Sequence, residues 1–460
     1  MQNSQGNYNN SRRRRSRRNS QGTQNPVSTS HNSSNSPNRS SSANPANINT
    51  HTPKSAKSNV SRKKIATVPK KKSLITLAAD KFFRKSTAGQ VTRYAEGVDR
   101  IFLIVIIILL CFGTVMVFSA SYANALWRYG DTYLFAKRQL MMAGLGVIAM
   151  IITSYIAEYR FLKKISVAFF IGVLALNYVT PFFGVLLNGT PRWFVLFGIQ
   201  FQPSELLKIA VIFIFSYYIT KTGDKMKTAK RGIFVPVLLT VSVVLPMYLQ
   251  SHFSGLIIIA AICILMIFIG EAPISWLLGF AGIGGGGLAY IILFTPYAKD
   301  RIDVWLDPFN EIFKGDESHQ IIQSLYAIGS GGLLGTGIGQ SKQKFLFLPE
   351  PQNDFIFAIV CEELGFIGAL IVIFLFVVLI WRGFVIAYHA PDKFSSLVVM
   401  GITLKVAIQF VLNIAVVTNT VPTTGISLPF FSYGGTALII LLIEMGVILC
   451  ISRYSYQEKV

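Results

Sequence analysis

The sequence predicts an all-α polytopic membrane protein with ten transmembrane helices, both termini in the cytoplasm and a large extracytoplasmic loop between helices 7 and 8. The chain has 460 residues, is 52% hydrophobic and has a mean hydropathy of +0.50, which is too apolar for an ordinary soluble domain. Apolar runs of about 20 residues, long enough to cross a bilayer, recur along it. Most of its net charge lies in one terminal segment.

Residues 1–95 form the first predicted region, a disordered, basic cytoplasmic tail rich in Ser and Asn. Residues 1–100 hold 20 of the 43 Lys and Arg residues and three of the 21 acids, so +17 of the net charge of +22 lies there. Residues 1–60 have almost no apolar side chains to offset their chain entropy. We interpret the tail as a topology anchor. Binding to anionic lipid headgroups or nucleic acid is the alternative, although no nucleic-acid partner is expected.

Residues 96–460 form the predicted ten-helix membrane domain. The segment before the first span lacks the short apolar h-region of a cleaved signal peptide. We therefore expect the first span to insert as an uncleaved anchor. The predicted spans are 101–120, 139–158, 164–184, 204–220, 232–250, 254–270, 274–295, 355–381, 395–418 and 436–452.

Lys and Arg in the short connections set the predicted orientation, because these residues are enriched on the cytoplasmic side. With ten spans, the tail and the connections after spans two, four, eight and ten all lie on one side. The loops 296–354 and 419–435 then face outward. The basic residues in those connections are Arg160, Lys163, Lys164, Lys221, Arg231, Arg382, Lys393, Arg453 and Lys459.

Cysteine and glycine patterns argue against several cofactors. All four cysteines fall inside apolar runs, so neither a disulfide framework nor a metal cluster is expected. The glycine clusters at 284–287 and 335–339 lack the Gly-Lys-Ser/Thr ending of a phosphate-binding loop. We expect neither a nucleotide nor a haem.

Charged residues at the start of the fourth span are the first candidate site. Gln202 precedes Pro203 at the predicted first helical position, and Glu205 could cap the first turn. Glu205 and Lys208 are three residues apart and share a helix face. One interpretation is a capped helix whose Lys208 extends to the lipid boundary. The other is a cationic pocket for a phosphate-bearing lipid, with Arg192 as a second cation.

The loop 296–354 is long enough to be functional. It carries Arg301 near its start and an apolar face spaced for a surface-lying helix at 320–328. Asp354 ends the loop directly before a span. It is either the N-cap of that helix or a catalytic base. Burial would raise its pKa, whereas the helix dipole and nearby cations oppose the rise, and the sequence leaves that competition open.

Several polar residues lie within the later spans, where they are energetically expensive. Glu362 and Glu363 lie roughly 10 Å below Asp354 along their helix. Lys405 and Glu444 reach similar depths when counted from opposite ends of spans nine and ten, so we predict an ion pair or a shared polar network between them. Lys405, Gln409 and Asn413 form a stripe with i+4 spacing on span nine.

Three long motifs resemble the SEDS family (shape, elongation, division and sporulation), which includes FtsW, RodA and SpoVE. The resemblance covers about residues 100–455. Val115 to Ser121 and Ile451 to Arg453 look more like division-type FtsW, or its sporulation relative, than RodA. The motifs are Asn188-Gly-x-x-Arg192-Trp193 with Phe201-Gln202-Pro-Ser-Glu205-Leu-x-Lys208, Leu348-Pro-Glu350 with Asn353-Asp354-Phe-Ile-Phe and Glu362-Glu363-Leu-Gly365, and Val421-Pro-Thr-Thr-Gly425 through Ser432-Tyr-Gly434-Gly435.

This resemblance implies a ten-span glycosyltransferase that polymerises lipid II with inversion at the donor anomeric carbon. Asp354 would be the base that deprotonates the acceptor hydroxyl. Arg192, Lys208 and Arg301, or a divalent metal such as Mg²⁺ or Mn²⁺, would stabilise the departing pyrophosphate. The other motif residues expected to bind substrate or pyrophosphate are Trp193, Gln202, Glu205, Glu363 and Ser432.

The resemblance also implies lipid II, a class B penicillin-binding protein and divisome proteins as partners. It places the protein in the bacterial cytoplasmic membrane, at the division septum. A lipid II flippase and a non-catalytic recruiter of the penicillin-binding protein are the competing functions. The sequence departs from the family where Gln-Pro-Asp is usual, because it reads Gln250-Ser-His252 there. We interpret His252 as a turn residue.

Overall fold

Apolar α-helices make up most of the described chain and follow the predicted spans in order. Seven are long and apolar enough to cross a membrane. In α7, α8 and α13 the apolar helical stretch is shorter. The helical membrane architecture is therefore confirmed, whereas the count of ten spans stays a prediction. The helices are α2 (Arg100–Tyr129), α3 (Leu134–Tyr155), α4 (Tyr159–Phe183), α5 (Pro203–Thr222), α6 (Val235–Leu249), α7 (Phe253–Ile269), α8 (Ile274–Phe294), α11 (Ile356–Tyr388), α12 (Lys393–Val417) and α13 (Thr436–Ser452).

The computed structural model describes residues 97–155, 158–187, 190–196, 199–294, 296–310 and 316–455. The tail 1–95 lies outside these residues, so its disorder and its partners stay predictions. The loop after α8 contains two helices, and the second of them covers the apolar pattern at 320–328. The shorter elements are η2 (Gly223–Lys227), η3 (Lys230–Phe234), α9 (Pro296–Leu306) and α10 (Asp316–Ser330).

Helix ends are set by capping residues that the sequence supplies. The Asp99 side chain accepts a hydrogen bond from the Phe102 amide at 2.9 Å and starts α2. Arg382, near the end of α11, pairs with the same carboxylate at 2.7 Å. A capping box between Asp392 and Ser395 starts α12. Because each of these caps satisfies an amide that the helix leaves unpaired, the helices begin at defined residues.

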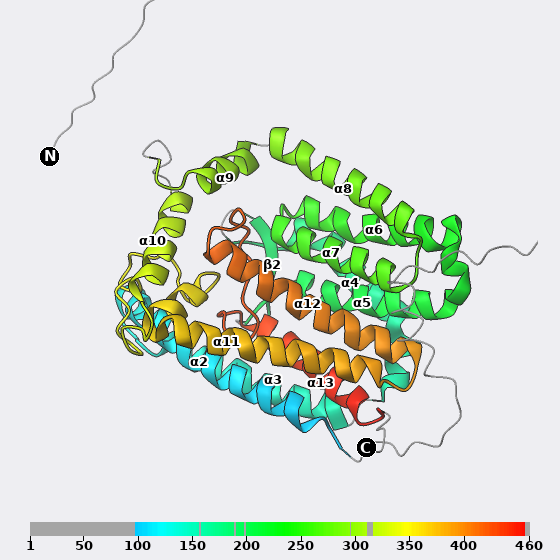
Figure 1. Ribbon diagram of the computed structural model, residues 1–460, viewed down its shortest axis with the longest axis horizontal. Helices are drawn as coiled ribbons and strands as arrows, with labels where there is room; N and C mark the ends of the chain where they lie inside the picture. The colour runs from blue at the N-terminus through cyan, green and yellow to red at the C-terminus, as the bar shows by residue number, and fades with distance from the viewer. Residues whose placement is uncertain are drawn as a thin grey trace, which may run out of the picture. The chain divides into compact units, whose positions relative to one another are not determined.

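Helix α12 is the central helix of the bundle. It packs against α5, α7, α11 and α13, and Figure 1 shows it between the α5–α7 layer and α11. Gly401 permits the close contact with α5, because a Cβ atom there would lie 2.6 Å from the Ile212 side chain. The polar stripe on this helix therefore faces protein rather than lipid.

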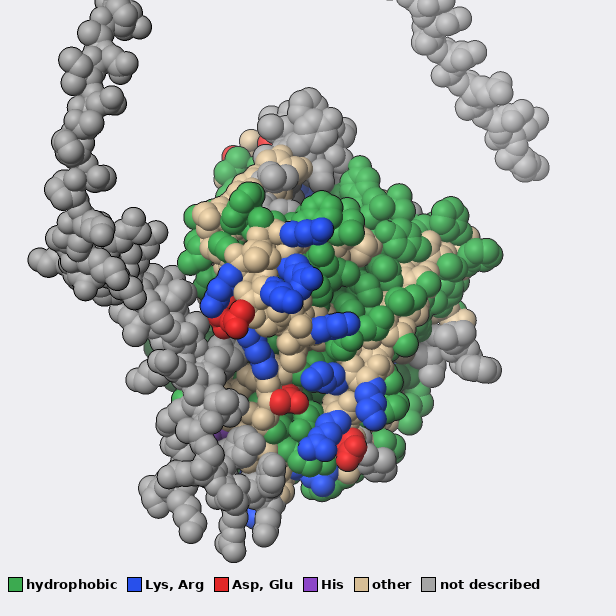
Figure 2. All heavy atoms as spheres, turned by 90° about the vertical axis from the view of Figure 1, so that its right-hand side faces the viewer, with side chains coloured by type: hydrophobic (Ala, Val, Ile, Leu, Met, Phe, Trp, Pro, Cys, Tyr) green, Lys and Arg blue, Asp and Glu red, His purple; other side chains and the backbone are tan. Residues whose placement is uncertain are grey.

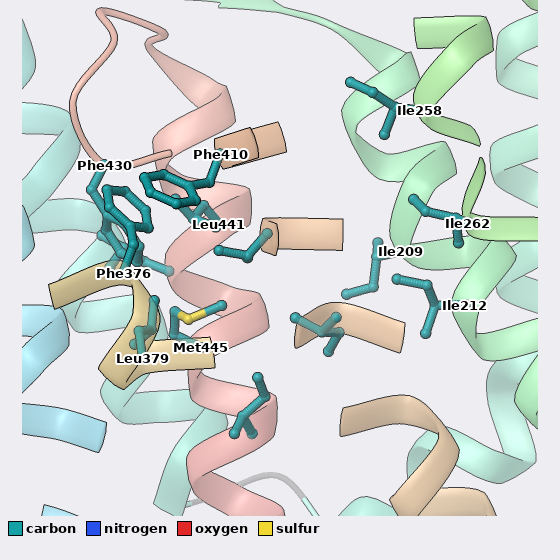
Figure 3. Packing of buried hydrophobic residues seen from close by; sticks show 14 of the residues in the cluster. Ile209, Ile212, Ile258, Ile262, Phe376, Leu379, Phe410, Phe430, Leu441 and Met445 are labelled. Carbon is teal, nitrogen blue, oxygen red and sulfur yellow. The ribbon is translucent and has the colours of Figure 1, made fainter. Parts of the chain in front are cut away.

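Two groups of apolar side chains fill the space on either side of α12 (Figure 3). Isoleucines of α5 and α7 form one group. The other is aromatic: Phe376 stacks on Phe410 at 4.3 Å between centroids and lies 6.3 Å from Phe430. Phe430 has a φ of 67°, which is unfavourable for a bulky residue, yet its ring is buried. Burial of the ring offsets that backbone strain and anchors the segment that connects α12 to α13.

A three-stranded antiparallel sheet, in the order β1-β2-β3, joins α4 to α5. Its strands are β1 (Val185–Leu187), β2 (Thr190–Leu196) and β3 (Ile199–Phe201). The predicted all-α fold class did not include this sheet, so the fold is mainly α-helical with one small sheet. Aromatic and β-branched residues are frequent here, and they favour strands where the backbone can pair with a neighbour.

The connection from α10 to α11 folds back along α11. The amides of Phe366 and Ile367 donate to the carbonyls of Gly332 and Leu333 at 2.9 and 3.2 Å. Gly365 breaks the helix there, with a φ of 68° that few residues other than glycine adopt. Above this break α11 is buried as far as its start, whereas below it the apolar side chains are exposed on one face. The change marks where protein gives way to the expected lipid contact.

Lys and Arg side chains gather on one end of the helix bundle (Figure 2). This end is where α11 ends and α12 begins (Figure 1). The positive-inside rule predicts that it faces the cytoplasm. The opposite end, which carries the sheet, α9, α10 and the start of α11, is then expected to face outward.

Gly113 in α2 is expected to be intolerant of a side chain. A Cβ atom there would lie 2.3 Å from the Phe430 carbonyl oxygen, so Gly113→Ala should reduce stability by about 1–3 kcal/mol. Thermal unfolding of the purified protein in detergent tests this. Gly144→Ala in α3 is the matched control, because no atom lies within 4 Å of that position. Equal melting temperatures for the two variants would contradict the packing described here.

Candidate active site

Asp354 lies two residues before the first residue of α11, and Figure 1 shows that this helix starts at the end of the bundle opposite the α11–α12 connection. Phe355, not Asp354, occupies the N-cap position. Among the described residues, none forms a hydrogen bond with the Asp354 carboxylate, so the helix-cap interpretation is wrong. The carboxylate is therefore available to a ligand.

Asn413 fixes the backbone of Asp354. Its side-chain amide donates to the Asp354 carbonyl oxygen at 2.8 Å and to the Ile426 carbonyl oxygen at 2.7 Å. Asn413 is fully buried in α12. Because the amide joins the start of α11 to the 421–435 segment, it holds these two family motifs together.

The surroundings of Asp354 decide the competition that the sequence left open. Burial raises the pKa of the carboxyl to about 6, against the opposing effect of the Arg301 guanidinium, while Glu350 adds to the rise. Arg301 also donates to the Thr423 carbonyl oxygen at 2.7 Å. A Cβ atom at Gly425 would lie 3.3 Å from Asp354 Oδ2. Burial therefore dominates, and the pKa suits a general base near neutral pH.

Arg192 fastens the sheet to the turn between α6 and α7. Its Nε and Nη2 atoms donate to the carbonyl oxygens of Gln250 and Ser251, at 3.1 and 2.5 Å. Trp193, the next residue on β2, pairs with Val185 of β1 and is half-buried. The turn thus sets where the Arg192 charge lies.

His252 is more than a turn residue. It is 9% exposed, and its ring interacts electrostatically with Arg192, Lys208 and Glu205. Burial, followed by the Arg192 and Lys208 charges, lowers its pKa to about 3, so the imidazole is neutral at physiological pH. Sequence reasoning missed this position. The departure from the usual Gln-Pro-Asp was the available signal.

Glu205 and Lys208 form a buried ion pair on the first turns of α5. The Lys208 ammonium lies 2.6 Å from Glu205 Oε1, and the Lys208 side chain is 3% exposed. Lys208 is thus enclosed by protein instead of extending to the lipid boundary, and Glu205 pairs with it rather than capping the helix. Gln202 is buried and precedes Pro203 at the start of the helix.

A cavity of about 30 Å³, room for about two water molecules, is lined in part by residues 427–430, 432 and 434. Glu205, Lys405 and Ser432 line it. The Ser432 hydroxyl accepts from the Leu428 amide at 2.7 Å and so also shapes the 427–434 loop. Lys405 donates to both Glu444 oxygens at 2.7 and 2.6 Å, which confirms the predicted ion pair.

The 421–435 segment connects the two halves of the candidate site. Its first part meets Asp354 and Arg301, and its second part lines the cavity beside Glu205. Arg192 joins the second half through its electrostatic contact with His252. Asp354, Arg301 and Glu205 therefore meet residues of one segment, whereas Lys208 and Arg192 are linked to this group through Glu205 and His252.

Glu363 belongs to a different set of contacts. It is fully buried and accepts hydrogen bonds from Ser119 Oγ at 2.6 Å and Lys344 Nζ at 3.0 Å. Glu362 accepts from Ser341 Oγ and the Lys342 amide nearby. These contacts join α2 and the 331–350 connection to α11, and none of the Glu363 contacts named here is to another predicted site residue. We call this set, with Ser119, Ser341, Lys344 and Glu362, the Glu363 network.

Fold and site together define a helical membrane protein with a carboxylate and several cations at one end of its bundle. The chain belongs to the FtsW/RodA/SpoVE family, since the model of that family, described as cell cycle protein, matches residues 99–457. Stage V sporulation protein E of Bacillus subtilis (strain 168) is 42% identical over 362 residues, which cover 78% of this chain and 97% of the relative. A probable peptidoglycan glycosyltransferase FtsW of Geobacter sp. (strain M18) is 38% identical over 363 residues, 78% of this chain and 98% of the relative.

Solved structures share the fold. RodA of Thermus thermophilus, a rod shape determining protein, matches with a TM-score of 0.59 at 25% identity, over 78% of this chain and 98% of its own. A chain from a peptidoglycan synthase complex that coordinates polymerization and crosslinking matches with a TM-score of 0.65 at 24% identity, over 78% and 99%. The RodA-like fold is thereby established.

A divalent cation stays an open expectation. Within the described ranges, no group of three or more His, Cys, Asp or Glu side chains could hold a metal ion. Asp354 and Glu350 are two carboxylates that interact electrostatically, beside the positive Arg301. We therefore assign steps only to residues of the chain.

Lys344 should contribute strongly to stability through the Glu363 network. Lys344→Met leaves the Glu363 carboxylate buried without its cation, so the free energy of unfolding should fall by about 3 kcal/mol. Arg128→Met is the control, because the Arg128–Glu350 pair is 46% and 42% exposed and should contribute less than about 1 kcal/mol. Thermal unfolding of both variants is the measurement, and similar losses in the two would argue against the network.

Proposed function

We propose that this protein is a peptidoglycan glycosyltransferase that polymerises lipid II at the outer face of the bacterial cytoplasmic membrane. The observation that carries the proposal is Asp354, a carboxylate without a hydrogen bond from the described residues and with a pKa near 6. It lies next to Arg301 and shares the 421–435 segment with the Glu205–Lys208 side of the site. The Geobacter relative named above carries the same activity in its name.

In the proposed reaction, Asp354 accepts the proton of the acceptor sugar's 4-hydroxyl. That oxygen attacks the anomeric carbon of the donor, and the bond from this carbon to undecaprenyl pyrophosphate breaks with inversion. Negative charge grows on the leaving diphosphate. Arg192, Lys208 and Arg301 are the cations that would stabilise it, since preorganised charges act strongly where water is excluded. Burial supports the base role, because it raises the Asp354 pKa to about 6, close to neutral pH.

The proposed setting is the division septum, with a class B penicillin-binding protein and divisome proteins as partners. The solved complex that couples polymerization to crosslinking supports a transpeptidase partner. The FtsW relatives favour division, and the sporulation relative makes sporulation the second candidate setting. The cytoplasmic membrane location rests on the apolar helices and on the family.

Asp354→Asn should abolish polymerisation. The amide cannot accept the hydroxyl proton, so we expect a loss of at least about 100-fold. The assay supplies labelled lipid II to the purified full-length protein, with its cognate class B penicillin-binding protein, and resolves glycan chains on a gel. Asp303→Asn, in α9, is the control, because it removes another acid of the 296–354 loop.

The same assay separates the alternatives. Transfer of lipid II between leaflets without glycan would favour the flippase. If Asp354→Asn forms as much polymer as the wild type, Asp354 is not the catalytic base, and the role of recruiting the penicillin-binding protein would be favoured.

Activity should rise as the pH increases through about 6, because Asp354 is protonated below its pKa and acts as a base only above it. Arg301 lowers that pKa and Glu350 raises it, so Arg301→Gln should move the midpoint to higher pH and Glu350→Gln to lower pH. Initial polymerisation rates measured from about pH 5 to about pH 8 give the midpoints. The protein must remain folded over this range. Identical midpoints in all three proteins would contradict the assignment of Asp354 as the base.

A further inference from the structure

Four charged side chains from three helices lie close together inside the bundle. Glu205 and Lys208 come from α5, Lys405 from α12 and Glu444 from α13. Their internal pairs are short, at 2.6 Å for Lys208–Glu205 and 2.7 and 2.6 Å from Lys405 to Glu444. We call them the charge quartet.

The two pairs of the quartet are not independent. Glu205 interacts electrostatically with Lys405 as well as with Lys208. Lys208 likewise interacts with Glu444. Glu205 therefore interacts with both lysines, and Glu444 is the direct ion-pair partner of Lys405.

The cavity gives this arrangement room to change. Glu205 and Lys405 both line it, together with residues 427–430, 432 and 434 of the connection between α12 and α13. Glu205 accepts from Lys208 through Oε1. Because the Glu205 carboxylate and Lys405 line the same cavity, this space lies open to a rotation of the carboxylate.

Lys208 as it stands is neutralised by Glu205. An anionic ligand would have to compete with that carboxylate for the ammonium. If Glu205 turns toward Lys405, the positive charge of Lys208 becomes available to a phosphate oxygen, and Glu205 is still paired in a low-dielectric site.

We propose that Lys405, held by Glu444, is a positioning residue for the diphosphate subsite, and that it acts through Glu205 on Lys208. This inference rests on the proposed function, since it assigns the diphosphate of the lipid-linked donor as the ligand that displaces Glu205. Glu444 prevents Lys405 from holding Glu205 permanently, because it shares the Lys405 charge. The alternative is that the pair only neutralises two buried charges.

The test replaces both partners at once with apolar residues of similar size, Lys405→Met with Glu444→Leu. Replacing a buried ion pair in this way is often neutral for stability, so the variant should unfold within about 4 °C of wild type. Polymerisation of lipid II should nevertheless fall at least about tenfold, through a raised KM. A reversed pair, Lys405→Glu with Glu444→Lys, places a carboxylate beside Glu205 and should lose more activity than the apolar pair at comparable melting temperature.

Thr403→Val is the matched control. Thr403 is a buried, uncharged residue of the same helix that contacts Gly383 of α11. Its substitution should change neither the melting temperature nor KM.

The outcomes separate the two proposals. Wild-type polymerisation that is lost in Asp354→Asn supports the proposed function whatever the quartet variants do. If the apolar pair then polymerises lipid II with wild-type KM, the positioning role is overturned and the pair only neutralises charge. If the apolar pair loses activity only in proportion to a large fall in melting temperature, and the reversed pair is fully active, the role is overturned as well. A raised KM at unchanged stability establishes it.

Discussion

A single buried amide, that of Asn413, donates to the carbonyl oxygens of Asp354 and Ile426, and the candidate site depends on these two hydrogen bonds. They join the start of α11 to the segment that follows α12. Without them, the carboxylate would have no fixed relation to Thr423 and Gly425, which bring Arg301 and the rest of the segment alongside. Asn413 itself is held by the packing of α12 among four helices.

The same helix carries the other polar contacts of the site in order of depth. Asn413 lies at the Asp354 end, Gln409 lines the cavity, and Lys405 pairs with Glu444 in the middle of the bundle. Their i+4 spacing places them on one face, which turns toward protein. An isolated charge at such depth would be expensive, so each one meets a counterion or lies at the cavity. The polar residues on α12 are therefore placed by their hydrogen-bond and ion-pair partners, in addition to the packing of the helix.

A second set of buried charges has a different use. The Glu363 network ties α2 and the 331–350 connection to α11 just above the break at Gly365. It supports the stretch of α11 that leads to Asp354, although its own side chains are enclosed. A residue's place in a family motif therefore does not show whether it contacts a substrate or only positions the residues that do. Burial and bonding partners do.

The positions of the long helices follow from the amino-acid order, because an apolar run of about 20 residues has few alternatives to spanning a bilayer. The same order also determined the Lys405–Glu444 pair, since the rise per residue fixes depth along a helix. The strands at 185–201, the burial of His252 and the bonding partners of Glu363 became visible only in the folded chain. Tertiary structure also decided that burial outweighs Arg301 at Asp354. These features depend on which faces of different helices pack together. The amino-acid order sets the depth of a residue along its helix, but it does not set which helices are in contact.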